Sequence, residues 1–238
     1  MSLSLPEYER GLRFRFPHPR EADEDGFLIA GGELSPLMLL SAYEQGIFPW
    51  FNPGDPVLWW SPDPRFVLEP GSLHAGNRLR RQLRQAGFTF TLDTDFSSVI
   101  ASCAGALRKG QPGTWITDSM IRAYTELHRL GFAHSVEVRR EGALAGGLYG
   151  LSLGSCFFGE SMFSLETGAS KGAFIALASL LFREGFVMVD CQLRTPHLEA
   201  LGAREIPRER FLDLLGQGLK APTLRGNWGE RFSPELPF

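Results

Sequence analysis

The clearest alternation of hydrophobic and polar positions lies between residues 143 and 192. Ala143–Gly150 and Ser155–Gly159 are short apolar runs of the kind that form β-strands, and Ser152-Leu153-Gly154 between them is typical of a turn. The sequence therefore predicts two adjacent strands in this region. The polar motif Gly159–Ser164 overlaps the end of the second strand.

A helix and a third strand are predicted next. The segment Ala173–Phe182 is mostly apolar, and four of its side chains recur at the spacing of one helical face: Phe174, Leu177, Ala178 and Leu181. Ser170 is a good N-cap, and Gly185 is placed to end the helix. The segment Phe186–Asp190 is rich in β-branched valine and is predicted to be a strand. The order of strand, helix and strand favours a right-handed βαβ unit with two parallel strands.

Further elements are predicted on both sides of this unit. Ser35 and Gly46 bracket a helix over Pro36–Gln45, and His134–Tyr149 alternates around a Glu-Gly turn as a β-hairpin does. The other expected elements are a strand at Phe27–Ala30, a strand end and a helix within Asp93–Ala104, a helix from Thr117 or Asp118 to Gly131, and short helices after Pro196 and Pro207.

Prolines divide the chain into two parts. They occupy positions 49, 53, 56, 62 and 64, and they exclude a long helix between Phe48 and Pro64. This rigid connector ends near Ser61–Asp63. We therefore predict a small N-terminal domain over residues 1–62 and a larger domain over residues 63–238. Together the predicted elements give an α+β fold with a mixed α/β sheet.

Composition limits the class of protein. Of the 238 residues, 43% are hydrophobic and 21% are charged, which is ordinary for a globular protein. The apolar run around Phe174–Phe182 is too short to span a bilayer, so no membrane partner is expected. Met1–Gly11 lacks the basic-then-apolar order of a signal peptide, which favours a cytoplasmic protein. Since the net charge is −3, any RNA contact must use a local basic patch.

The cysteines indicate neither a disulfide framework nor a zinc site. Cys103, Cys156 and Cys191 are odd in number and include no C-x-x-C pair. We expect each to be a buried, reduced thiol, and we expect no metal.

Two acidic residues are candidates for chemistry. Glu160 and Asp190 would each lie at the carboxyl end of a strand in the βαβ unit, which is where open α/β sheets bind ligands. Gln192 lies two residues beyond Asp190 and therefore on the same face of its strand. By topology alone, the better explanation of the two acids is that they are surface residues that make caps and ion pairs.

A basic helix face and two tryptophans are candidates for RNA contact. Four arginines crowd into seven residues on one side of a predicted helix: Arg78, Arg80, Arg81 and Arg84. A charge run of this kind is often only a solvated face, although guanidinium groups suit phosphate geometry. Trp50 and Trp115 follow turns that can present an indole face to a nucleic-acid base. For Trp59 and Trp60 we favour packing between the two domains.

Several blocks of the sequence, in the same order and with plausible gaps, resemble the leucyl/phenylalanyl-tRNA–protein transferase family. The resemblance covers most of the chain. The blocks are Gly31–Pro36, Gly46–Phe51, Trp59–Arg65, Gly113–Thr117, Gly159–Ser164, Val189–Gln192 and Leu201–Ala203. Ala200 departs from the serine expected in the family, but it keeps a small residue there.

The resemblance implies a function and a fold. It implies that Leu or Phe, and Met more weakly, moves from aminoacyl-tRNA to the N-terminal α-amine of proteins that begin with Arg or Lys, and that the product is marked for degradation. It implies an acetyltransferase-like (GNAT-like) domain after a small N-terminal domain. The aminoacyl ester is already activated, so no cofactor, ATP or metal is required. A monomer is expected, although nothing in the sequence specifies the oligomeric state.

The resemblance also implies roles for residues. Trp50 and Trp115 would bracket the 3′-terminal adenosine, with Tyr43 and Tyr124 as weaker helpers. The arginine face would meet the acceptor stem of the tRNA.

Further roles concern the two reacting groups. Glu160 and Asp190 would form an acidic pocket for the cationic acceptor, and Gln192 would bind the attacking amine. Whether Gln192 or a ribose hydroxyl takes the proton stays open. The aminoacyl side chain needs an apolar pocket, for which five residues are candidates: Met162, Leu148, Leu177, Leu181 and Val189. Core packing is an equal alternative for Leu177 and Leu181.

Three other functions compete with this interpretation. Gly159–Phe163 nearly spells the G-x-S-x-G motif, and Ser161, Asp190 and His197 occur in the order of an α/β-hydrolase triad, but Phe163 replaces the final glycine. An acyl-CoA-dependent acetyltransferase needs a glycine-rich pyrophosphate loop, and the nearest candidate, Arg139–Leu144, falls in the predicted hairpin. A non-catalytic RNA-binding module would leave the acidic motifs without a task.

Overall fold

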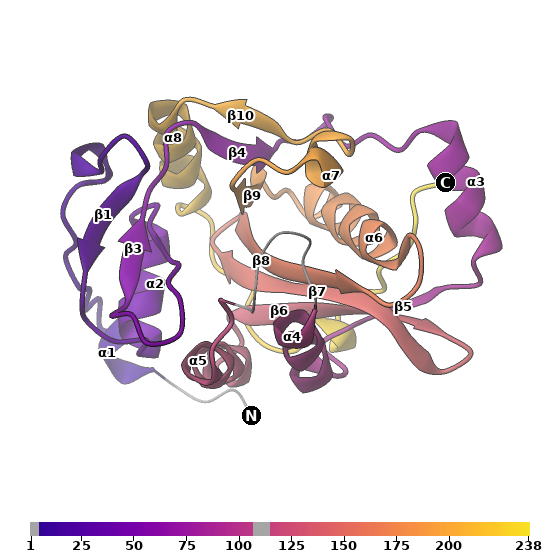
Figure 1. Ribbon diagram of the computed structural model, residues 1–238, viewed down its shortest axis with the longest axis horizontal. Helices are drawn as coiled ribbons and strands as arrows, with labels where there is room; N and C mark the ends of the chain where they lie inside the picture. Colours follow the sequence, from indigo (N-terminus) through magenta and orange to yellow (C-terminus); the bar gives the residue numbers. More distant parts are fainter. Residues whose placement is uncertain (1–4, 107–114) are drawn as a thin grey trace.

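The computed structural model describes residues 5–106 and 115–238. Figure 1 shows a large twisted sheet with helices on both faces, and a smaller group of N-terminal elements beside it. Gly113 and Thr114, which belong to one of the motif blocks above, lie outside the described residues. Within the described residues, no helix is both long and apolar enough to cross a membrane.

The N-terminal elements surround a three-stranded antiparallel sheet in the order β1-β3-β2. They are α1 (Pro6–Glu9), a 3₁₀ helix (Pro19–Glu21), β1 (Phe27–Ala30), α2 (Pro36–Glu44), β2 (Phe48–Pro49) and β3 (Leu58–Trp60). The prediction for α2 is confirmed to within one residue, because the Ser35 hydroxyl accepts the Met38 N–H at 3.4 Å and so caps the helix.

The large sheet has seven strands in the order β10-β4-β9-β8-β7-β6-β5. In chain order these are β4 (Arg65–Leu68), β5 (Thr89–Leu92), β6 (Ala133–Arg140), β7 (Ala143–Leu153), β8 (Cys156–Ser164), β9 (Met188–Gln192) and β10 (Arg204–Ile206). Strands β8 and β9 are parallel, and the other neighbouring strands are antiparallel. The prediction of an α+β fold with a mixed sheet is confirmed.

Helices cover both faces of this sheet. They are α3 (Asn77–Gln85), α4 (Phe96–Gly105), α5 (Asp118–Arg129), α6 (Ala169–Arg183), α7 (Pro196–Glu199), α8 (Arg208–Gly218) and a 3₁₀ helix (Trp228–Glu230). A Cβ at Gly146 would touch Ala169 of α6, whereas one at Gly147 would approach Val99 of α4, so these helices pack on opposite faces. Two hydrophobic cores result, one on each side of the sheet.

The predicted βαβ unit is present as β8, α6 and β9. Two details of the prediction are wrong. Strand β8 continues through the polar motif because β7 pairs with it up to Ser164, so Glu160 lies within the strand and not at its end. Ser170 is not the N-cap of α6, because the helix begins earlier, at Ala169, and Gly168 caps it in a left-handed conformation.

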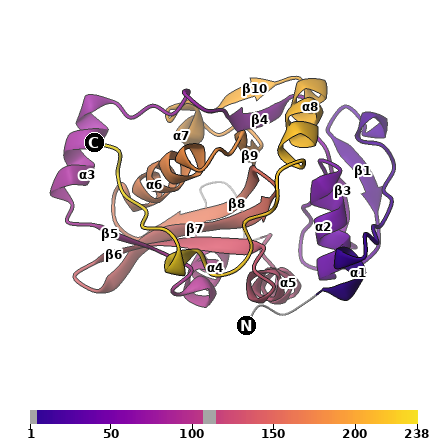
Figure 2. The same ribbon diagram turned by 180° about the vertical axis from the view of Figure 1, so that it is seen from behind.

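The C-terminal segment crosses behind the sheet from α8 to α3 (Figure 2). Trp228 anchors it, since this side chain is 1% exposed and its indole stacks on the His134 ring with centroids 3.7 Å apart. The backbone N–H of Trp228 donates to the buried carboxylate of Asp93 at 2.8 Å. These contacts hold an otherwise irregular tail against strands β5 and β6.

Position 202, in the Leu201-Gly202-Ala203 block, requires glycine for a steric reason that can be tested. Gly202 has φ +104°, and a Cβ there would lie 1.9 Å from the Ser72 carbonyl oxygen. Gly185 has a similar φ of +83° but has no neighbouring atom within 4 Å. We expect Gly185→Ala to lower the free energy of unfolding by about 1 kcal/mol, and Gly202→Ala to lower it by clearly more. Urea unfolding measures both, and equal losses would contradict the clash.

Candidate active site

A cavity of about 580 Å³ lies where strands β8 and β9 separate. Their parallel pairing ends at the Phe158–Asp190 pair, although β8 runs on to Ser164 and β9 to Gln192. The gap that opens beyond this pair is walled by residues from β2, β7, β8, α6 and the turn before α7. The site is therefore built at the carboxyl end of the parallel pairing, as the βαβ topology predicts.

Glu160 points into this cavity from an irregular position in its strand. Tyr149 of β7 pairs with Ser161, and Gly150 pairs with Gly159, so Glu160 is the extra residue of a β-bulge. A bulge re-aims the side chain that it carries. Here it directs the Glu160 carboxylate toward the wall that contains Gln192.

Three donors hold the Glu160 carboxylate. The Tyr43 hydroxyl donates to Oε1 at 2.6 Å, the Tyr124 hydroxyl donates to Oε2 at 3.0 Å, and Gln192 Nε2 donates to Oε1 at 3.3 Å. Burial raises the pKa of Glu160 to about 7, although the two phenolic hydroxyls oppose this rise by bonding the charged form. Glu160 is thus a carboxyl group that titrates near neutral pH at a cavity wall.

Tyr43 and Tyr124 do not have the place predicted for them. Both side chains are 0% exposed, neither lines the cavity, and their hydroxyl oxygens are in contact with each other. Burial raises the pKa of each phenol far above its usual value, so both remain hydrogen-bond donors. They cannot stack on a base because protein covers their rings. They position Glu160 instead.

Asp190 also departs from its predicted role in an acidic pocket. Its carboxylate accepts from Arg65 Nε at 2.9 Å and from Arg65 Nη2 at 2.7 Å, and both side chains are fully buried. This bidentate pair already balances the charge of Asp190, which does not line the cavity. Arg65 was not among the predicted site residues, and its signal in the sequence was its place at the end of the Trp59–Arg65 block.

The Arg65–Asp190 pair bears on the site through Gln192. Asp190 Oδ1 also accepts the backbone N–H of Gln192 at 2.9 Å, and it holds that residue at φ +57°, a conformation uncommon outside glycine. The Gln192 side chain lines the cavity with its amide nitrogen toward Glu160. Its amide oxygen is left as an acceptor at the site.

Trp50 and Trp115 come together at the cavity from distant parts of the sequence. Trp50 lies just after β2, and its ring packs on Trp60 with centroids 5.6 Å apart. Trp60 Nε1 also donates to the Trp50 carbonyl at 2.6 Å, which fixes the backbone there. Trp59 is 1% exposed and bonds the Gly31 carbonyl, so it packs within the N-terminal elements. Stacking of Trp50 and Trp115 on a base stays a prediction.

The apolar part of the cavity includes most of the predicted pocket residues. Met162, Leu148, Leu177 and Val189 line it. Leu181 does not, because it lies one helical turn beyond Leu177 and is buried in the core under α6. Three phenylalanines that were not predicted as pocket residues also line this wall: Phe157, Phe163 and Phe174. The helical periodicity shared by Phe174 and Leu177 was the available signal.

The arginine face exists on α3, away from the cavity. Arg78, Arg80, Arg81 and Arg84 are exposed, whereas Leu83 on the other side of the helix is 2% exposed. The guanidinium groups of Arg80 and Arg84 lie over the Phe238 ring, 5.2 and 5.7 Å from its centroid. Helix α3 lies at the opposite end of the molecule from the N-terminal elements (Figures 1 and 2).

The geometry argues against the competing chemistries. Ser161 lies inside strand β8 and not on a strand-to-helix elbow, and Asp190 pairs with Arg65 and not with a histidine. Arg139–Leu144 forms the β6–β7 hairpin turn, with Arg139 bonded to the Gly142 carbonyl. Burial raises the pKa of the Cys191 thiol at the cavity, so it is no thiolate nucleophile at neutral pH.

The sequence predicted three buried, reduced thiols. The three cysteines are free thiols, two of them buried and Cys191 partly buried. Over residues 5–106 and 115–238, no group of three or more histidine, cysteine or acidic side chains is arranged to hold a metal ion.

Comparison with known proteins identifies relatives over nearly the whole chain. Residues 67–216 match the family described as leucyl/phenylalanyl-tRNA protein transferase, and residues 32–63 match the N-terminal domain of that family. The leucyl/phenylalanyl-tRNA–protein transferase of Syntrophus aciditrophicus is 57% identical over 224 residues, which cover 94% of each chain. That of Maridesulfovibrio salexigens is 56% identical over 214 residues, covering 90% of this chain and 89% of that protein.

Solved structures with some likeness include acetyltransferases. A ribosomal-protein-alanine N-acetyltransferase from Brucella melitensis biovar Abortus 2308 is 18% identical, with a TM-score of 0.34 over 46% of this chain and 83% of that chain. The structure of L-PGS from Bacillus licheniformis is 12% identical, with a TM-score of 0.39 over 66% of this chain and 50% of that chain.

The buried ion pair under the site generates a stability prediction. Arg65→Met leaves Asp190 as an unpaired buried charge, so we expect the free energy of unfolding to fall by roughly 3–5 kcal/mol. The double variant Arg65→Met/Asp190→Leu removes both charges and should be more stable than the single variant. Urea unfolding compares the two. A double variant less stable than the single one would contradict this account.

Proposed function

The chain belongs to the leucyl/phenylalanyl-tRNA protein transferase family and is an aminoacyltransferase, and we propose that it transfers Leu or Phe, and Met more weakly, to proteins that begin with Arg or Lys. The donor is the aminoacyl-tRNA, and the acceptor group is the N-terminal α-amine. The added residue marks the acceptor protein for degradation. The observation that carries the proposal is the meeting of Glu160, Gln192, Trp50 and Met162 at one cavity.

The reaction needs positioning more than activation. The α-amine attacks the ester carbonyl carbon, a peptide bond forms, and the ribose oxygen leaves with a proton. An α-amine has a pKa of about 7.7–8.0, so a useful neutral fraction exists near pH 7.5 without a strong base. Holding both substrates in one cavity can then supply much of the rate.

Glu160 and Gln192 bind the acceptor. Glu160 titrates near neutral pH, and its ionised form suits a cationic N-terminal residue that enters the cavity. The Gln192 amide oxygen accepts a hydrogen bond from the attacking amine. Asp190 positions Gln192 through the backbone N–H and does not contact the substrate.

The donor fills the rest of the cavity. The wall formed by Met162, Leu148, Leu177 and Val189 suits apolar side chains that are not branched at Cβ, and the flexible methionine adapts to both Leu and Phe. Such a pocket rejects smaller side chains by only about 1–3 kcal/mol per methylene, so some use of other amino acids is expected. Trp50 and Trp115 hold the terminal adenosine, and the arginines of α3 hold the acceptor stem. A cytoplasmic monomer fits a tRNA substrate and a cavity complete within one chain.

A transfer assay tests the function. Radiolabelled Leu-tRNA is incubated with a peptide that begins with Arg, or with the same peptide beginning with Ala, without ATP or acetyl-CoA. We expect label on the Arg peptide alone. Glu160→Gln should lower this transfer by roughly 100-fold, since it removes the charge that faces the acceptor, and should keep tRNA binding. Glu184→Gln on the exposed end of α6 is the control. Equal loss of binding and transfer would give Glu160 a structural role.

The pH dependence of transfer tests the hydrogen bond that the Tyr43 hydroxyl donates to Glu160. The Tyr43 hydroxyl lowers the pKa of Glu160, so Tyr43→Phe should raise that pKa above about 7. Less of the carboxylate is then ionised at a given pH, and the acidic limb of kcat/KM for the Arg peptide moves to higher pH. The control is Tyr8→Phe, whose hydroxyl bonds Glu44. The acceptor amine titrates identically in both variants. If the acidic limb of the kcat/KM profile does not move in Tyr43→Phe, the proposal that ionised Glu160 binds the acceptor is wrong.

A further inference from the structure

Two parts of the proposed tRNA site are separated by the first turn of α6. The cavity would hold the terminal adenosine and its ester, whereas the arginines on α3 would hold the acceptor stem. The single-stranded 3′ end must pass between them. Each phosphodiester of that strand carries one negative charge, so its path needs positive potential.

The first turn of α6 touches both places. Ser170 of this turn lines the cavity. On the other side, Gln82 of α3 donates from Nε2 to the Thr167 carbonyl at 3.2 Å, and a Cβ at Gly168 would lie 3.1 Å from the same Nε2. The turn is therefore a continuous bridge from the cavity wall to the arginine helix.

Lys171 is the cation on this bridge. It is partly exposed and forms no ion pair among residues 5–106 and 115–238. By contrast, Arg194 pairs with Glu199 at 2.9 Å and Arg140 pairs with Glu166 at 2.8 Å. Lys171 therefore has no carboxylate partner among the described residues to leave before it binds an anion.

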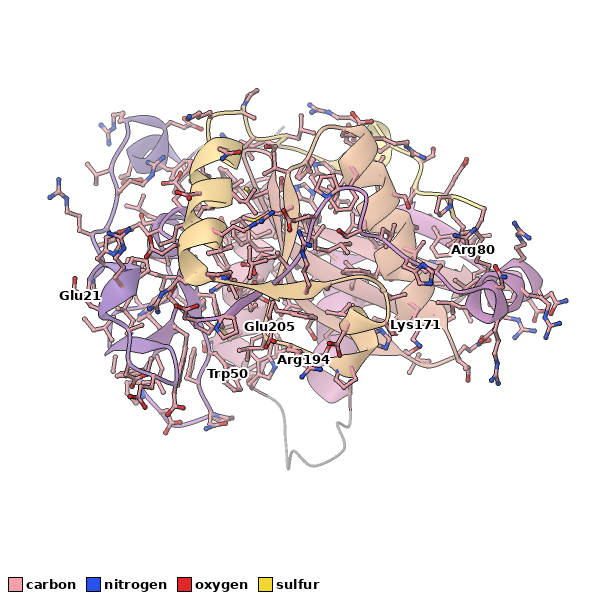
Figure 3. All side chains as sticks on the ribbon, turned by 90° about the horizontal axis from the view of Figure 1, so that it is seen from above. Glu21, Trp50, Arg80, Lys171, Arg194 and Glu205 are labelled. Atoms are coloured by element: carbon pink, nitrogen blue, oxygen red, sulfur yellow. The ribbon has the colours of Figure 1, made fainter. Side chains whose placement is uncertain are left out.

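Lys171 directly follows the cavity-lining Ser170 in α6 and is close enough to His197 for its charge to act on that ring. The His197 ring lines the cavity, and burial, followed by the charge of Lys171, lowers its pKa. The imidazole is therefore neutral near pH 7, and the positive charge near this ring resides on Lys171. The Nε2 atom of His197 has no hydrogen-bond partner among the described residues. Figure 3 shows Lys171 between Arg194, on the Trp50 side, and Arg80 of α3.

We propose that Lys171 binds a phosphodiester of the single-stranded 3′ end and guides that strand from the cavity to the arginine face of α3. This inference rests on the proposed function. Lysine acts here as a point charge on a flexible stem, which suits a mobile single strand that needs no fixed geometry. The bases are left unread, so the contact serves every aminoacyl-tRNA that the cavity accepts.

Three donors of increasing length test the proposal. Leucyl-adenosine has no phosphodiester, leucyl-CCA trinucleotide has the single strand, and Leu-tRNA adds the acceptor stem. For Lys171→Gln, we expect the ratio of kcat/KM for leucyl-CCA to that for leucyl-adenosine to fall roughly tenfold, as for one lost charge-assisted contact. For Arg81→Gln on α3, only the ratio of Leu-tRNA to leucyl-CCA should fall. Lys220→Gln, an exposed lysine beyond α8, is the matched control.

The salt dependence gives an independent readout. Loss of one phosphate contact to a single strand should reduce the slope of log kcat/KM for leucyl-CCA against log salt by about 0.7. Lys171→Arg keeps the charge and should restore both the ratio and the slope.

Two outcomes would overturn the proposal. Equal losses of kcat/KM with leucyl-adenosine and leucyl-CCA would show that Lys171 shapes the cavity. An unchanged kcat/KM with both donors would show that the strand takes another path. Failure of the proposed function looks different, because the unmodified protein would then transfer leucine from none of the three donors.

Discussion

The site depends on the buried ion pair between Arg65 and Asp190. The Arg65 guanidinium donates twice to the carboxylate and once to the Gly46 carbonyl, and it lies over the rings of Phe48 and Phe211. One side chain thus ties β4 to β9, to the N-terminal elements and to α8. Because the cost of desolvating two charges offsets much of their attraction, the pair contributes more to geometry than to net stability. The geometry in question is the position of Gln192, just where β9 has left β8.

The N-terminal elements complete the site as well as flanking it. Tyr43 of α2 and Tyr124 of α5 hold the two oxygens of Glu160, which the β-bulge in β8 aims into the cavity. Trp50, just beyond β2, forms another part of the same wall. A carboxyl group with a pKa near 7 is produced by burial against three neutral donors, and those donors come from both halves of the chain.

Charge is separated along the molecule in the way that the proposed anionic donor and cationic acceptor require. The titrating acid is enclosed in the cavity, where a cationic acceptor would meet it with little screening by solvent. The exposed guanidinium groups of α3 lie outside it, with Lys171 between. A net charge of −3 conceals this arrangement, since the sum over the chain carries no information about position.

Some features of this protein follow from local sequence, whereas others depend on its tertiary structure. The sequence by itself determined the βαβ unit, the caps of α2 and α5, the basic face of α3 and the family, because periodicity, capping and motif order are properties of neighbouring residues. Only the tertiary structure decided that Asp190 is neutralised by Arg65, that Tyr43 and Tyr124 are buried positioning groups, and that Leu181 belongs to the core. The charge state and exposure of a side chain depend on atoms that approach it from distant parts of the chain, and no local pattern records those atoms.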